Sequence, residues 1–312
     1  MLPFLIPSLF FGWSLGANDA ANIFGTAVTS KIIKYRTTIL LSAAFIVLGA
    51  LLQGQKGMET ISAVSSQTLL TGSISVLSAA ITMTIMTFFK FPVSSSQAII
   101  GSIIAISLMN GETINWDVIL KVVLAWIFTP LGGLFFGFIS FKLLSKPFNK
   151  LNSVYLQDRV LKISTMIIGS YGAYSLGANN VANITGVFAQ NIGVFNATLI
   201  GGIAIAIGVL TFSKRVMFTV GKSIVPLDHF SSAIAVLGES ITVWIYALIG
   251  IPVSTSQAIV GAVIGAGMAR GGNTIDKKTV FKIILAWVNT PLSAAFISFL
   301  ICSVLKMLGI NI

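Results

Sequence analysis

Two copies of one polar motif lie inside apolar stretches of the chain, and their residue types suit a cation. Residues 16–22 read GANDAAN and residues 177–183 read GANNVAN. Buried carboxylates and carboxamides are costly, so a matched pair favours a functional role over a polar loop at a membrane surface. Ionised Asp19 only accepts hydrogen bonds, and with amide and backbone oxygens it suits sodium; a proton on Asp19 is the alternative. The predicted sodium ligands are Asp19, Asn18, Asn22, Asn179, Asn180 and Asn183.

A second repeated motif predicts two helix starts with the chemistry of an anion site. It reads SSSQ at residues 94–97 and STSQ at residues 254–257, each time after Pro-Val and before an apolar run. In such a capping box the hydroxyl accepts from the third helical N–H and the Gln side chain reaches back. The remaining donors point outward from the positive end of the helix, which suits an oxyanion; the alternative is a plain helix start in a structural hairpin. The candidate anion ligands are Ser94, Ser95, Ser96, Gln97, Ser254, Thr255, Ser256 and Gln257.

Four further residues are weaker candidates. Thr129 and Thr290 each precede a proline that is expected to disrupt its helix. Their hydroxyls are candidates to bind an ion, and the equally good alternative is a hydrogen bond to the backbone of their own helix. Glu239 lies midway along an apolar segment, where an ionisable group is a candidate for a proton or cation, or else lines a solvated crevice. Lys90 is expected to extend to the inner surface or to attract an incoming anion.

The amino-acid composition indicates that these motifs lie in a membrane protein. The 312 residues are 55% hydrophobic and only 9% charged, with mean hydropathy +0.97, far from the roughly 25% charged residues of soluble domains. The chain is therefore expected to be an all-α polytopic membrane protein. Its net charge of +11 sits in short loops between apolar segments, which indicates membrane topology and not nucleic-acid binding. One cysteine excludes a disulfide framework, and the absence of Lys or Arg before Lys31 argues against a cleaved signal peptide.

The order of the motifs predicts an internal duplication. Both polar motifs and a third motif, residues 124–131 and 285–292, recur in the same order at offsets of 160 or 161 residues. Small-residue packing motifs that arose independently would not keep order and spacing. We therefore expect a first repeat at 1–144, a basic hinge at 145–162 and a second repeat at 163–312, each repeat with about five membrane segments.

Loop charges predict that the two repeats are inserted in opposite orientations. The hinge is basic, which places it in the cytoplasm, and each pair of equivalent loops differs in charge. Inverted repeats with interrupted or re-entrant helices near the midplane are a common transporter design, and here we expect the polar motifs at 16–22 and 177–183 to interrupt their helices. Five segments per repeat then place both termini outside, unless the short pieces at 92–108 and 252–268 are single arms of re-entrant hairpins. The loop pairs are 31–36 with 190–196, 53–67 with 214–222, and 109–117 with 270–278.

At these motifs the chain resembles the inorganic phosphate transporter family, whose signature Gly-Ala-Asn-Asp-Val-Ala-Asn occurs once in each half. The resemblance covers nearly the whole chain. It implies a cation-coupled phosphate importer of the plasma membrane, a homodimer, with Asp19 and the asparagines serving the cation and the Ser/Thr/Gln clusters holding phosphate. Two departures stand out: Asn180 replaces the second signature Asp, and Gln97 and Gln257 replace a His found in many members, which favours sodium over a proton relay.

The sequence therefore predicts secondary active uptake of phosphate with sodium by alternating access between the two repeats. A proton-coupled phosphate permease or a sulfate permease is the nearest alternative, and a passive anion channel is a more distant one. No nucleophile–base pair or histidine cluster is visible, so we do not expect an enzyme, and no cofactor is expected beyond the coupling ion.

Overall fold

The protein is a bundle of long helices. The computed structural model describes residues 2–89, 93–223, 227–271 and 277–310, and within these ranges it contains no β-strand, only an isolated bridge. Lys90 and Pro92 lie outside the described residues. The helices are α1 (Leu2–Thr29), α2 (Tyr35–Gln53), α3 (Gln55–Ser62), α4 (Leu69–Phe88), α5 (Ser95–Asn110), α6 (Trp116–Asn149), α7 (Val154–Thr185), the 3₁₀ turn η1 (Gly186–Phe188), α8 (Ala189–Ile192), α9 (Val194–Ser223), α10 (His229–Ile249), α11 (Thr255–Arg270) and α12 (Lys277–Met307).

The expected all-α membrane class is confirmed. Among the described residues, six helices are long and apolar enough to cross a bilayer, within α2, α4, α6, α9, α10 and α12. Helices α1 and α7 have 28 and 32 residues. At about 1.5 Å per residue they too exceed the ~30 Å hydrocarbon thickness, although they carry the polar motifs.

The polar motifs do not interrupt their helices, contrary to the sequence prediction. α1 is continuous through residues 16–22, and α7 is continuous through residues 177–183. Motif side chains form hydrogen bonds with residues of other helices, and the motif glycines allow neighbouring helices to pack closely. A methyl group on Gly16 would overlap the carbonyl of Ile205 on α9, and one on Gly177 would overlap the carbonyl of Ile46 on α2. Close interhelical contact therefore keeps both segments helical.

The real breaks lie before the short helices α5 and α11. Each has 16 residues, about 24 Å, which is less than a hydrocarbon core. The end of α5 returns to the start of α4, where Ser107 donates to Ser65 over 2.8 Å. The end of α11 likewise returns to the start of α10 through the Arg270–Asp228 ion pair at 2.9 Å. Each pair is thus a helical hairpin whose second arm begins in the interior, which favours the re-entrant alternative.

The two halves have matching elements and exchange partners. Helix α1 packs on α9 as α7 packs on α2, and α5 packs on α12 as α11 packs on α6. Both C-terminal ends of the short helices use a left-handed glycine, Gly111 and Gly271, at φ of 68° and 94°. The duplication predicted from the motifs therefore extends to contacts between helices. The opposite orientation of the halves in a membrane remains a prediction.

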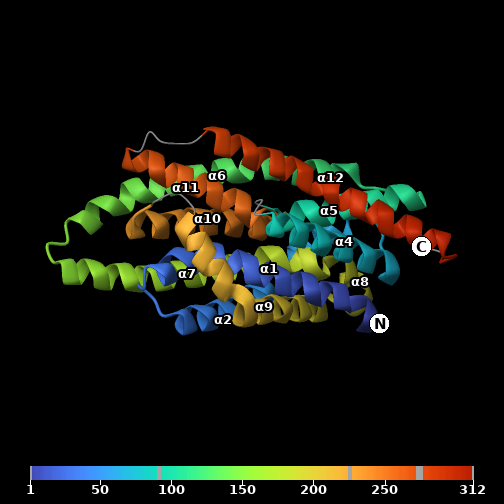
Figure 1. Ribbon diagram of the computed structural model, residues 1–312, viewed down its shortest axis with the longest axis horizontal. Helices are drawn as coiled ribbons and strands as arrows, with labels where there is room; N and C mark the ends of the chain where they lie inside the picture. Colours follow the sequence, from blue (N-terminus) through green and yellow to red (C-terminus); the bar gives the residue numbers. More distant parts are fainter. Residues whose placement is uncertain (1, 90–92, 224–226, 272–276, 311–312) are drawn as a thin grey trace.

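The link between the halves lies far from the termini. Both chain ends lie at one end of the longest axis, and the turn joining α6 to α7 lies at the other end (Figure 1). Within the predicted hinge, residues 145–149 finish α6 and residues 154–162 begin α7, so only four residues, 150–153, are outside a helix. The proposed domain boundaries stay a prediction.

Candidate functional site

Asp19 joins three helices in the protein interior. It lies on α1, is buried, and its Oδ2 atom accepts hydrogen bonds from Asn180 Nδ2 at 3.1 Å and Thr255 Oγ1 at 2.9 Å. Asn180 belongs to α7, and Thr255 is the first residue of α11. The repeated motif of one half is therefore bonded to its copy and to the helix start in the other half.

The asparagines of α7 form a continuous network beside Asp19. Asn180 Oδ1 accepts from Asn179 Nδ2 at 2.7 Å and from Asn183 Nδ2 at 3.4 Å. Asn183 Nδ2 also reaches Ser95 Oγ on α5, at 3.3 Å. Positions 179, 180 and 183 share one face of the helix, as a spacing of three and four residues requires. We call Asp19, Ser95, Asn179, Asn180, Asn183 and Thr255 the central cluster; all six residues are buried.

Asn179 also fixes the backbone that leads into α11. Its Nδ2 donates to the carbonyl of Val253 at 2.8 Å, and its Oδ1 accepts from the N–H of Val253 at 3.0 Å. This two-point contact satisfies both polar groups of a buried residue outside any helix, as buried backbone requires. Val253 could not be predicted from local sequence, because this apolar residue takes part only through its backbone.

The predicted helix starts are confirmed, but one half of the capping box is wrong. Ser94 Oγ accepts from the N–H of Gln97, and Ser254 Oγ accepts from the N–H of Gln257, both at 3.3 Å. The Gln side chains do not reach back, and in the described structure the buried Oε1 atoms of both lack a partner. The carboxamides are therefore free to bond another group.

The starts of α5 and α11 lie next to one another. Ser256 Oγ donates to the carbonyl of Val93 at 2.9 Å, across the two halves. Ser254 and Ser256 hydroxyls are 2.8 Å apart, and those of Ser94 and Ser96 are 3.1 Å apart. Two helix N-termini, each with two hydroxyls, thus meet beside the central cluster, and together they can present donors to one oxyanion.

Several buried oxygen acceptors on α5, α7, α10 and α11 lack a hydrogen-bond partner. Among the described residues these include Asn183 Oδ1 and Glu239 Oε2, together with the two Gln oxygens. Buried polar atoms are normally paired, so unpaired ones at a candidate site indicate a bound cation, water or donor. Glu239 lies on α10 and is buried. The matching position of α4, at an offset of 160 residues, is the apolar residue Ala79.

The remaining predicted residues lie outside the cluster. Asn18 Nδ2 donates to Thr87 Oγ1 at 3.0 Å, and Asn22 is half-buried. Thr129 and Thr290 donate to carbonyls of their own helices, at 2.6 and 2.8 Å, as the alternative for these residues supposed. The helix disruption expected there is wrong, because α6 and α12 run on through the prolines.

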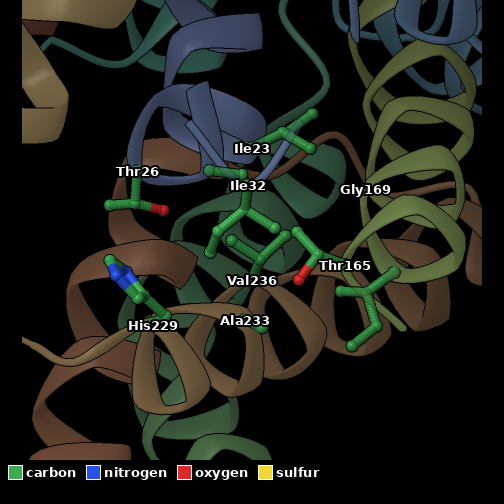
Figure 2. A pocket seen from close by; sticks show the side chains of 10 residues that line it. Ile23, Thr26, Ile32, Thr165, Gly169, His229, Ala233 and Val236 are labelled. Carbon is green, nitrogen blue, oxygen red and sulfur yellow. The ribbon is translucent and has the colours of Figure 1, made fainter. Parts of the chain in front are cut away.

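A small cavity near α1 is separate from this site. Figure 2 shows it between Ile23, Thr26, Thr165 and His229. Its volume is about 10 Å³. That is roughly the space of one water molecule. None of the central cluster lines it.

Long apolar helices around a buried Asp–Asn–Ser–Thr cluster and two adjacent helix starts define a polytopic membrane protein with an interior polar cluster that is a candidate ion site. The chain matches the profile described as the phosphate transporter family over residues 15–298, and it belongs to that family.

Relatives support this assignment over almost the full length. A protein of Pyrococcus furiosus named "Putative phosphate permease" is 30% identical, over 98% of this chain and 97% of its own. The sulfate permease CysP of Bacillus subtilis is also 30% identical, over 95% of this chain and 85% of its own. A solved structure described as the sodium-dependent phosphate transporter superposes with a TM-score of 0.87, at 25% identity over 98% of both chains.

Proposed function

We propose that this protein imports inorganic phosphate together with sodium by alternating access. The observation that carries the proposal is the bond between Asp19 and Thr255. It places an acceptor group suited to a cation against the first residue of a helix start suited to an anion. The similar solved structure is named for sodium-dependent phosphate transport, which supports the same pairing of ligands.

In this proposal sodium binds at Asp19 with oxygen ligands from α7 and α11. The carboxylate keeps lone pairs beyond those used by Asn180 and Thr255, and Asn183 Oδ1 has no other partner in the described structure. The Thr255 hydroxyl has its proton directed to Asp19, so its own lone pairs are free for the ion. Asn180 supplies an uncharged side chain where the first repeat has Asp19, and its Oδ1 already accepts from Asn179 and Asn183.

Phosphate binds at the two helix starts. Ser94, Ser96, Ser254 and Ser256 provide hydroxyls, and the first backbone N–H groups of α5 and α11 have no helical carbonyl to bond. Their positive helix ends favour an anion. In this proposal the amide groups of Gln97 and Gln257 add further donors.

The two ligands lie close enough to assist one another. A cation at Asp19 offsets charge that phosphate brings into the interior, so each ligand raises the affinity for the other by the same factor. The matched halves then move against one another to expose the shared site to one side at a time. A passive channel would lack this coupling and would only equilibrate its anion.

Sulfate is the second candidate, because CysP of Bacillus subtilis and the archaeal permease have the same 30% identity to this chain. The unpaired buried oxygens of Gln97 and Gln257 favour phosphate over sulfate. Phosphate keeps a proton near neutral pH and can donate it to such an acceptor, whereas sulfate has none to donate. Glu239 is a further acceptor and is the residue on which coupling to protons would depend.

A homodimer in the plasma membrane is proposed with the function, on the strength of the resemblance. Cross-linking in native membranes, followed by sizing of the solubilised protein, measures the number of copies. A single copy at all cross-linker concentrations would refute the dimer.

The test of the function is uptake of radiolabelled phosphate into proteoliposomes. An inward sodium gradient should drive accumulation above equilibrium, and excess sulfate should not suppress it. Accumulation that follows a pH gradient would move the coupling to protons. Flux that only equilibrates would indicate a channel, and suppression by sulfate would reassign the substrate.

A further inference from the structure

An apolar groove lies between α6, α7 and α10, away from the central cluster. It has a volume of about 430 Å³, within the ~300–1,000 Å³ typical of sites for organic ligands. Phe148 and Phe230 stack at 4.5 Å between ring centroids. Apart from Ser164 its lining is apolar, and it includes Leu144, Phe148, Leu161, Ile167, Phe230 and Ile234.

Basic side chains flank this groove in the sequence and on the surface. Lys146 and Lys150 flank the lining residues Pro147 and Phe148, and Arg159 and Lys162 flank Val160 and Leu161. All four basic residues are exposed. Within the described residues none of the four has an ion-pair partner. The one acidic residue of the hinge, Asp158, leaves the rim strongly positive.

We propose that this groove binds an anionic phospholipid, with an acyl chain against its apolar walls and the phosphate headgroup among the four basic residues. The occupant must be apolar along one part and negative at one end, and the surrounding bilayer supplies such a molecule. Juxtamembrane basic residues each strengthen binding to an anionic membrane surface about fivefold. Basic pockets between membrane helices are a known setting for anionic headgroups.

The groove is bounded on the side of the transport site. It shares Ile168 and Ala233 with the small cavity of Figure 2, which has room for about one water. A lipid chain therefore stays in the groove and contacts α10 over residues 230–237, ending two residues before Glu239. The lipid would hold together the ends of α6 and α7 and the helix that carries Glu239.

Native mass spectrometry of the purified full-length protein in neutral detergent tests this proposal. The probes are dioleoyl phosphatidylglycerol and dioleoyl phosphatidylcholine at equal concentrations, without phosphate or sodium. The wild type should retain the anionic lipid at least tenfold better. Removing two flanking charges with K146Q and R159Q should lower its retention about 30-fold, and S164F, which fills the groove, should lower retention of both lipids.

A matched pair of substitutions controls for general surface charge. K31Q and R36Q remove the same charge from exposed residues at the connection between α1 and α2, which lie beside no groove residue in the sequence. The proposal is overturned if this control loses the anionic lipid equally, if both lipids bind alike, or if S164F changes nothing. It is also overturned if S164F dissociates an oligomer, because a second copy would then occupy the groove.

A milder variant and a readout other than transport keep the lipid test separate from protein misfolding and from the proposed transport function. S164L is the milder groove variant to use where S164F does not elute as a single species on size exclusion. Lipid retention is measured without transport, so its failure leaves sodium-driven phosphate uptake unaffected, and the reverse holds as well.

Discussion

Replacing Thr255 by valine tests whether the helix start of α11 serves the cation. The change keeps the branched shape and removes the hydroxyl that donates to Asp19 over 2.9 Å. A hydrogen bond to a charged group contributes about 1.5–3 kcal/mol, and about 1.4 kcal/mol is a factor of ten. If the hydroxyl oxygen is worth as much to sodium, the sodium concentration for half-maximal uptake should rise roughly 10- to 150-fold.

Thr290→Val is the matched control for this change. Its hydroxyl donates to the carbonyl of Ala286 in its own helix, so the same chemical change should alter sodium dependence less than about twofold. The assay is phosphate uptake into proteoliposomes over a range of sodium concentrations, with phosphate saturating. Equal effects of the two variants would refute the reasoning. If Thr255→Val changed only the KM for phosphate, Thr255 would be assigned to phosphate binding and not to sodium binding.

Three further predictions concern packing and charge. Gly16→Ala should lower the thermal midpoint, since overpacking against the α9 backbone costs about 1–3 kcal/mol, whereas Gly267→Ala, with open space around it, should leave the midpoint unchanged or higher. Asn180→Asp puts a second carboxylate beside Asp19. Because two adjacent carboxylates cannot both ionise without a compensating cation or proton, phosphate uptake should require a further sodium or a lower pH. Unchanged dependence of uptake on sodium and pH would contradict this. Arg270→Gln removes a half-exposed ion pair of about 1 kcal/mol or less, so any loss of thermal stability should be small and disappear in 1 M KCl, and a salt-independent loss would show a different role.

Local chemistry made part of the site predictable. Ser94 and Ser254 were expected to start helices because an N-cap depends on residues three positions apart, and both do. The duplication was visible because order and spacing survive where individual residues change. Even the replacement of the second acid by Asn180 could be read directly from the motif.

Contacts between distant helices were not predictable from one sequence. Asp19 and Thr255 are 236 positions apart, and their motifs predict different ligands for them, whereas their side chains are hydrogen-bonded. The expected helix interruption at the motifs was inferred from polarity alone. It failed because Asn180 bonds to Asp19 on α1 and Asn179 bonds to the backbone of Val253 before α11, so the backbone of α7 stays intact.

The exchange of partners between the halves has a consequence for how the chain is made. Helix α1 leaves the ribosome early, yet its main neighbour α9 and the Asp19 partner Thr255 are synthesised much later. At about 5–20 residues per second, Asp19 waits roughly 12–47 s for that hydroxyl. An acid at a helix centre costs about 2.5–3.5 kcal/mol on insertion, so the apolar remainder of α1 must hold it in the membrane meanwhile. Membrane insertion therefore requires the other residues of α1 to be apolar, independently of any ligand. Truncated chains should expose the unpaired carboxylate of Asp19 to membrane quality control.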